Sequence, residues 1–282
     1  MSALRIRLPA KPENVAVVRQ ALTGLGDAFE LDPDFLSDIR TAVTEACNNV
    51  VIHAYPGDQP GLLEVEADPG DGTAVDVLVR DYGAGLQPNT TPSEERSLGL
   101  GLPLIAALAR RFEIRGREGG GLDVRMMFAP NNEGSDEVRV ERISDADAER
   151  SAPTAGMSIV PGPLVSAISS RVTAMLAARV DFPLDRLADA VLVSDAISAH
   201  AEQYVAGEDV GLAIEDGDDA LDFRVGPLRE GGARGLLSEL EVPGFGGSLE
   251  RLVDGVDVEE APTTGGRGEF LVLTIRREDD EP

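Results

Sequence analysis

The sequence is poor in cysteine, histidine, tryptophan and lysine. Its 282 residues include one cysteine, two histidines, one lysine and no tryptophan. A lone cysteine, Cys47, cannot form an internal disulfide or a cysteine metal cluster. His53 and His200 lie far apart in the sequence, so a histidine metal site or a Ser-His-Asp triad is poorly supplied. Aromatic residues make up only 4% of the chain, which implies aliphatic cores.

Long apolar runs and positive charge are also scarce. No run approaches the ~18 apolar residues of a membrane span, and residues 1–9 do not resemble a signal peptide. The formal net charge is −26, which repels phosphate backbones and anionic lipids. We therefore expect a cytoplasmic protein that binds neither nucleic acid nor membranes.

The length favours two domains. Residues 130–156 are rich in Asn, Glu, Asp, Ser, Pro and Gly and have weak apolar periodicity, which is typical of a linker. Residues 1–130 carry a net charge of −7 and the rest of the chain carries −19. We predict a first domain over residues 1–130, an acidic linker over 131–156 and a second domain over 157–282.

Apolar periodicity predicts an α/β fold for the first domain. Leu4, Ile6 and Leu8 alternate with arginines, as in a half-buried strand. Helical spacing and alternation predict, in order, helices over 15–29 and 35–53, a hairpin over 63–79, a helix over 102–111 and a hairpin over 112–128. This order predicts a two-layer α/β sandwich, a mixed and mostly antiparallel sheet with helices on one face.

The second half repeats this pattern. Residues 184–191 resemble residues 36–43 at an offset of 148, and two further segments recur in the same order at similar offsets. Repetition at a nearly constant offset predicts a duplicated domain.

The helix over residues 35–53 carries polar residues at the edge of its apolar stripe. At 100° per residue, Glu45 and Asn49 lie four residues apart on one shoulder of the stripe. Cys47 lies close enough to the stripe to pack as a small residue, and His53 falls back into it as a structural residue. A carboxylate and an amide on this shoulder either line a pocket or form a solvated edge.

Asp81 continues the alternation of Val75, Val77 and Val79 along a strand, so its carboxylate is predicted to face inward with these valines. A buried acid needs hydrogen-bond donors. Gly83 and Gly85 follow at once and allow backbone to approach a ligand, although a polar strand end before a turn gives the same pattern.

A glycine-rich segment precedes the third predicted helix. Gly99 and Gly101 alternate with Leu98 and Leu100 before residues 102–111. Such a loop exposes unpaired N–H groups at a helix N-terminus and favours an anion such as phosphate. It lacks the lysine of a P-loop and does not follow a strand as a dinucleotide-binding fingerprint does.

The three motifs together resemble a known family. Residues 45–55, then Asp81 with Gly83 and Gly85, then Gly99 and Gly101 are similar to the N, G1 and G2 boxes of the GHKL ATP-binding superfamily. Within it, residues 44–55 are most similar to the anti-sigma factor serine kinases of bacteria. The resemblance covers residues 4–130 and implies a Bergerat-type ATP-binding fold.

The resemblance implies a role for each motif. Asn49 is the implied Mg²⁺ ligand and Glu45 the implied general base, which accepts a proton from a substrate serine. Asp81 is implied to accept from the adenine amine, beside backbone at Gly83 and Gly85. The lid over the phosphates is implied to comprise Leu98, Gly99, Leu100 and Gly101.

The second copy is predicted to lack this site. At the offsets above, Glu45, Asn49 and Asp81 correspond to Val193, Ile197 and Pro227. Apolar residues cannot hold Mg²⁺ or take up a proton, so we expect a degenerate domain that does not bind ATP.

Two functions remain open. The first is an ATP- and Mg²⁺-dependent protein serine kinase whose implied partners are a STAS-type anti-anti-sigma protein and a sigma factor. The alternative is a non-catalytic module that sequesters a protein partner when ATP closes the lid. Because kinases of this family commonly pair, the degenerate repeat is expected to make a pseudo-dimer within one chain, with a homodimer as the alternative.

Overall fold

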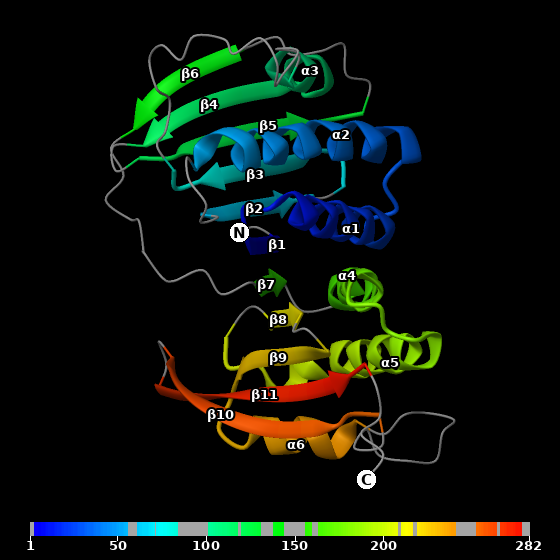
Figure 1. Cartoon of the computed structure of the whole chain (residues 1–282). Coiled ribbons are helices and arrows are strands. Elements are labelled where there is room, and N and C mark those ends of the chain that lie inside the picture. Colours follow the sequence, from blue (N-terminus) through cyan, green and yellow to red (C-terminus); the bar gives the residue numbers. More distant parts are fainter. Residues whose placement is uncertain are drawn as a thin grey trace. The chain divides into compact units, whose positions relative to one another are not determined.

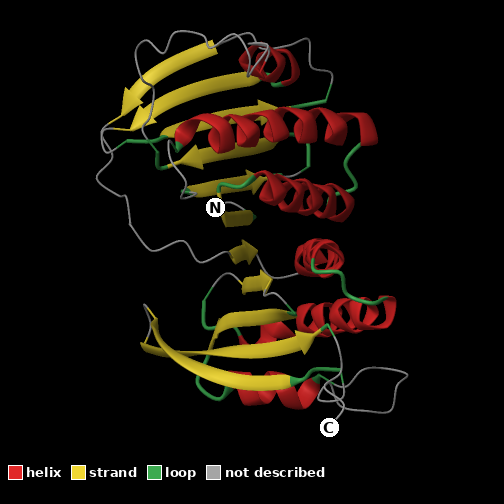
Figure 2. Cartoon of the chain, in the orientation of Figure 1, coloured by secondary structure: helices red, strands yellow, loops and turns green. Residues whose placement is uncertain are grey.

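The computed structural model describes residues 3–55, 61–70, 72–83, 101–117, 120–130, 138–143, 156–159, 163–207, 210–216, 219–240, 252–263 and 266–277. The chain divides into two compact units, Met1–Thr154 and Ala155–Pro282. Figure 1 shows their helices and strands, and Figure 2 shows the same view by secondary structure.

The first unit is a two-layer α/β sandwich. Its elements are β1 (Leu4–Pro9), α1 (Pro12–Ala28), α2 (Pro33–Asn49), η1 (Val50–Ala54), β2 (Leu62–Asp68), β3 (Val75–Asp81), α3 (Gly101–Leu108), β4 (Arg111–Arg117), β5 (Leu122–Phe128) and β6 (Val138–Ile143). The strands lie in the order β1-β2-β3-β5-β4-β6. Neighbours are antiparallel except for β4 and β6, and the helices cover one face (Figure 1). The predicted fold class is confirmed.

Local sequence explains these elements. Val75, Val77 and Val79 are buried on the helix side of β3, as their alternation predicts. Helix α2 begins after Asp32, whose Oδ1 accepts the backbone N–H groups of Asp34 and Phe35 at 3.0 and 3.1 Å. The core of this unit is aliphatic with two buried phenylalanines, Phe112 and Phe128.

The second unit has the strand order of the first, without an equivalent of β6 among its described residues. Its elements are β7 (Gly156–Ile159), α4 (Pro163–Arg179), α5 (Leu184–His200), η2 (Ala201–Tyr204), β8 (Val210–Asp216), β9 (Ala220–Leu228), α6 (Gly232–Glu239), β10 (Gly255–Thr263) and β11 (Gly266–Arg276). The strand order β7-β8-β9-β11-β10 matches β1-β2-β3-β5-β4 position by position. The antiparallel ladders between these strands match as well.

Part of the predicted linker is a strand. Within residues 131–156, β6 pairs in parallel with β4, with Val138 beside Phe112 and Val140 beside Ile114. The prediction was wrong for this segment because its polar composition masked a short alternation of aliphatic and charged residues.

The predicted residue pairing between α2 and α5 is also wrong. Val193 and Ile197, assigned as equivalents of Glu45 and Asn49, are almost completely buried, whereas Glu45 and Asn49 are half-buried. When the buried positions of α5 are aligned with those of α2, the alignment of the two helices shifts by one residue or by nearly one helical turn. Leu192 or Ala196 then takes the place of Glu45, so no carboxylate stands there in either alignment.

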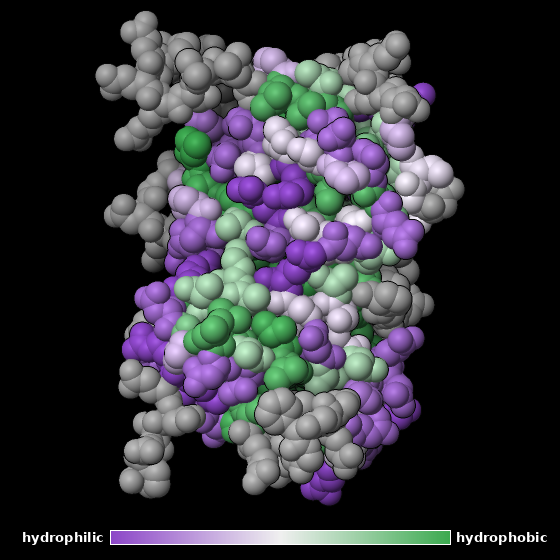
Figure 3. Space-filling model, turned by 90° about the vertical axis from the view of Figure 1, so that its right-hand side faces the viewer, coloured by the Kyte–Doolittle hydropathy of each residue, from purple (hydrophilic) through white to green (hydrophobic). Residues whose placement is uncertain are grey.

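Exposed apolar side chains occur in separate patches. On the side shown in Figure 3, hydrophobic residues are interspersed with hydrophilic ones. Leu102 and Leu104 of α3 are among the exposed apolar residues.

Among the described residues, no helix has both the length and the apolar character that crossing a membrane requires.

Candidate functional site

Helix α2 carries Glu45 and Asn49 at the edge of its buried face. Ile39, Ala42, Val43, Ala46 and Cys47 pack into the core, while Glu45 and Asn49 are half-buried one turn apart. Burial raises the pKa of the Cys47 thiol to about 12, so this cysteine is an inert packing residue, as predicted. Two oxygen-bearing side chains therefore share one shoulder of the helix.

The helix changes character immediately after Asn49. Residues Val50–Ala54 form a π-helix, in which each turn takes in an extra residue. This shifts the phase of the side chains, and His53 is exposed rather than buried. The prediction that His53 returns to the apolar stripe was wrong because it assumed 100° per residue throughout.

Asp81 ends β3 with its carboxylate buried, only 4% exposed, as its strand parity predicts. Its Oδ1 accepts the backbone N–H of Gly83 at 2.8 Å. Burial raises the pKa of Asp81 to about 6 and nearby Asp123 adds to the rise, while the Gly83 hydrogen bond opposes it. A buried carboxylate with a perturbed pKa is typical of a functional site.

The hydroxyl of Tyr55 fixes the backbone next to Asp81. It donates to the carbonyl of Leu62 at 2.5 Å and accepts the N–H of Tyr82 at 2.7 Å. A Cβ at Gly61 would lie 1.9 Å from the Tyr55 ring, so glycine is required for this packing. Sequence reasoning missed Tyr55 as a positioning residue, because this bond depends on a contact between separate elements.

The side chain of Tyr82 belongs to a second network on β1, β2 and β3. Its hydroxyl donates to Glu64 at 2.8 Å, and Arg7 also donates to this buried carboxylate, at 2.9 Å. Burial disfavours the charge on Glu64, but these donors and Arg80 hold its pKa below the usual value. The network was not predicted, because it joins side chains from three strands that are separate in the sequence.

Gly83 is required by close backbone packing. A Cβ at this position would lie 2.0 Å from the carbonyl oxygen of Ala54, at the end of the π-helix. Replacing Gly83 by Ala is expected to lower the free energy of unfolding by about 1–3 kcal/mol through overpacking. Urea denaturation of the full chain measures this change.

Gly207→Ala is the matched control, because a Cβ there meets no atom within 4 Å. It should leave the free energy of unfolding within about 0.5 kcal/mol of the wild type or raise it slightly. Equal stability of Gly83→Ala and the wild type would contradict the packing described for Gly83.

The glycine-rich motif is only partly within the described residues. Gly85, Leu98, Gly99 and Leu100 lie outside them, and Gly101 is the first residue of α3. Ile105 anchors α3 in the core. The motif thus leads directly into a helix, as its sequence predicts.

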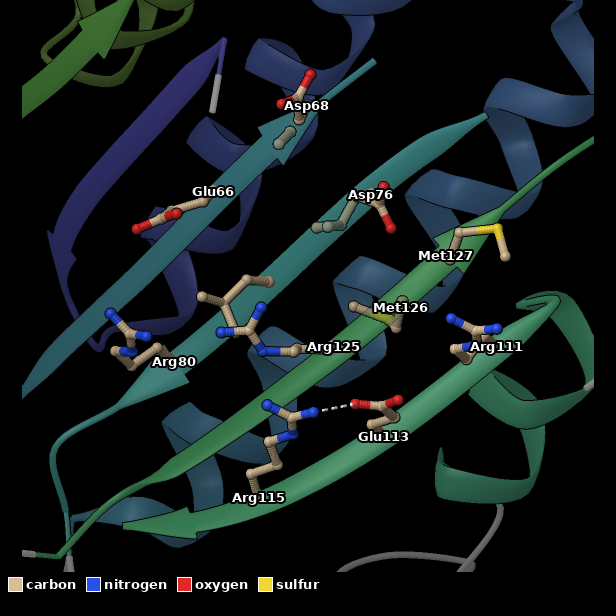
Figure 4. A pocket seen from close by; sticks show the side chains of 13 residues that line it. Glu66, Asp68, Asp76, Arg80, Arg111, Glu113, Arg115, Arg125, Met126 and Met127 are labelled. Carbon is tan, nitrogen blue, oxygen red and sulfur yellow. Dashed lines mark hydrogen bonds and ion pairs between the residues drawn. The ribbon is translucent and has the colours of Figure 1, made fainter. Parts of the chain in front are cut away.

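A hollow of about 490 Å³ lies on the opposite face of the sheet. Charged side chains from four neighbouring strands line it (Figure 4). Arg80 binds Asp123 through two hydrogen bonds of 2.8 and 3.0 Å, and Arg115 pairs with Glu113 at 2.8 Å. Glu45, Asn49 and Asp81 do not line this hollow, so it is separate from the candidate site.

Comparison with known proteins matches the first unit to a family of ATPases. Residues 8–128 match the model of the histidine kinase-like ATPase domain. The serine-protein kinase RsbW of Bacillus licheniformis is 32% identical over 147 residues, covering 48% of this chain and 89% of that protein. RsbW of Bacillus subtilis (strain 168) is 31% identical over 142 residues, covering 46% and 87%. The anti-sigma F factor of Clostridium beijerinckii is 31% identical over 132 residues, covering 43% and 90%.

Proposed function

The chain belongs to the histidine kinase-like ATPase family that includes RsbW and the anti-sigma F factors, and from this premise we propose that it is an ATP- and Mg²⁺-dependent protein serine kinase. The observation that carries the proposal is the pair of Glu45 and Asn49, half-buried one turn apart on α2. This pair supplies a base and a cation ligand on the same helix shoulder.

Asp81 and Gly83 form the adenine end of the proposed site. One oxygen of Asp81 already accepts from Gly83, and a carboxylate has further acceptor capacity for an exocyclic amine. Gly83 keeps the backbone close to Ala54, and Tyr55 holds Tyr82 in place. Gly85 is proposed to line the same end of the site.

Asn49 and Glu45 form the phosphate end. Mg²⁺ prefers oxygen ligands and usually keeps several waters, so one amide oxygen at the edge of the core fits such a cation. The bound cation would neutralise phosphate charge. Glu45 is proposed to hold the proton that a substrate serine gives up during phosphoryl transfer.

Leu98, Gly99, Leu100 and Gly101 are proposed to form a lid over the phosphates. Gly101 begins α3, and the first N–H groups of a helix have no partners within the helix. These groups and the helix dipole favour a bound phosphate.

The proposed partners are a sigma factor and a STAS-type anti-anti-sigma protein whose serine accepts the phosphoryl group. The second unit, residues 157–282 of the predicted division, is proposed to be a degenerate repeat that does not bind ATP. Its matching strand order supports a repeat, and the apolar residues in place of Glu45 support the loss of its site. It would replace a second subunit, giving a pseudo-dimer within one chain.

Calorimetry with ATP and Mg²⁺ tests the proposed site and its number per chain. The wild type is expected to bind one ATP, and Asn49→Ala is expected to bind at least about tenfold more weakly, because a hydrogen bond or ligand to a charged group contributes ~1.5–3 kcal/mol. Asn48→Ala, one residue away on α2, is the matched control and should bind like the wild type.

The number of ATP molecules bound per chain and the affinity of Asn49→Ala decide between the possible outcomes. Two sites per chain would refute the degenerate second unit. Absence of binding would refute the kinase proposal and leave a protein-interaction scaffold. Equal affinity of Asn49→Ala and the wild type would remove Asn49 from the site.

A further inference from the structure

The two units differ at the outer edge of their sheets. In the first unit, β6 pairs with β4 and supplies the last strand. In the second unit, β10 is equivalent to β4 and ends the sheet, and the described residues supply no strand beyond it. β10 pairs with β11 over nine consecutive residues without a bulge. A long, regular edge of this kind is a template for another strand.

The aliphatic residues of β10 are exposed where those of β4 are buried. Val256 and Val258 pair with Leu273 and Leu271, which are buried, so both valines belong to the helix-side face of the sheet. They are 40% and 45% exposed. Phe112 and Ile114 are their equivalents on β4, because they likewise pair with buried residues of the adjacent strand. These two residues are only 1% and 6% exposed.

The first unit shows what kind of strand completes such an edge. The β6 sequence, Val138–Ile143, reads Val-Arg-Val-Glu-Arg-Ile, and its two valines take the register positions beside Phe112 and Ile114. Arg139 takes the position beside Glu113. Aliphatic residues thus stand beside buried residues, and a basic residue stands beside an acidic one.

The acidic residues of β10 also favour basic residues on an added strand. Its residues include Asp257 and Glu259 and no basic residue. Glu259 accepts a hydrogen bond from Arg224 at 2.8 Å, and Asp257 accepts the backbone N–H of Val258 at 2.8 Å, so each carboxylate keeps a second oxygen as a further acceptor. The second half of the chain carries a net charge of −19. An added strand that alternates aliphatic and basic residues would place aliphatic side chains beside Val256 and Val258. Its basic side chains would then stand beside Asp257 and Glu259.

We infer that the outer edge of β10 binds an extended segment of a partner protein in which aliphatic and basic residues alternate, by addition of a strand to the sheet. Main-chain hydrogen bonds supply affinity in this mode, and alternate side chains supply specificity. The inference is independent of the proposed kinase activity, because the second unit lacks the candidate catalytic residues.

A labelled peptide with a Val-Arg-Val-Arg-Val core and Gly-Ser ends tests this inference by fluorescence anisotropy against the full chain. The wild type is expected to bind it saturably. Val258→Ser, which removes apolar contact without adding charge, and Val258→Lys, which also adds a like charge, should each bind about tenfold more weakly or worse. Leu184→Lys is the matched control, because Leu184 is an exposed leucine of the same unit, and it should bind like the wild type.

Hydrogen exchange locates the bound peptide. The amides of residues 255–260 should exchange more slowly when the peptide is bound to the wild type, and a peptide with Glu in place of Arg should have no effect. Absence of binding, equal binding of both peptides, or unchanged binding to the Val258 variants would overturn the inference. A concentration-dependent dimer that Val258→Lys abolishes in sedimentation would also overturn it, because a second copy would then occupy the edge.

Discussion

Replacing Asp81 with Asn is expected to weaken ATP binding about 100-fold, because a buried hydrogen bond to a charged group contributes up to ~3 kcal/mol. In the variant, an NH2 group takes the place of one acceptor oxygen and presents a donor to the adenine amine. The bond from Gly83 already uses one oxygen, so the side chain cannot turn without losing it. Calorimetry with ATP and Mg²⁺ gives the affinity.

Asp76→Asn is the matched control, because Asp76 lies on β3 and lines the hollow on the other face of the sheet. It should bind ATP like the wild type. If Asp81→Asn also binds ATP at full strength, Asp81 does not contact the base and the proposed adenine end of the site is wrong.

The pKa of Asp81 adds a pH dependence to the same experiment. Because this pKa is raised to about 6, protonation removes the negative charge and turns one acceptor oxygen into a donor, so ATP affinity should fall as the pH decreases from 7 to 5. Stability changes in the opposite direction. The folded state binds the proton more tightly than the unfolded state, so the contribution of Asp81 to the free energy of unfolding increases as the pH falls from about 6 towards 4. Asp81→Asn should lack both effects.

The inward position of Asp81 was predictable because strand alternation depends only on local sequence. Val75, Val77 and Val79 set the parity, and the structure places Asp81 on the same buried face. Burial of Cys47 followed from helical periodicity in the same way. These local patterns were sufficient to place the candidate acid and the α2 shoulder.

Features that depend on contacts between distant segments were not predictable. The π-helix after Asn49 changes the phase that the sequence pattern assumed, and the Tyr55 bond to Tyr82 joins residues 27 positions apart. Strand β6 was missed because its pairing with β4 gives an otherwise polar segment its structure. The Tyr55 bond and the pairing of β6 are tertiary contacts, which a local sequence pattern does not contain.

Glu45→Gln is expected to lower the rate of phosphoryl transfer about 10²- to 10⁴-fold, the usual contribution of a general base. ATP affinity should change less than about twofold, since the proposed role of Glu45 is to take a proton from the substrate and not to hold ATP. The measurement is transfer of labelled γ-phosphate from ATP to STAS-type proteins of the same organism, each with a Ser→Ala variant to identify the acceptor. Asp38→Asn, an exposed acid on the same helix, is the matched control.

This experiment separates the kinase from the non-catalytic module. A wild type that binds ATP and transfers no phosphate to any such protein would favour a module that only sequesters its partner. Transfer at the full rate by Glu45→Gln would keep the kinase but place its base elsewhere. Loss of transfer by Glu45→Gln with ATP binding retained would assign the base to Glu45. In that variant Asn49 would still hold the nucleotide on the same helix shoulder, but the proton of the substrate serine would have no acceptor.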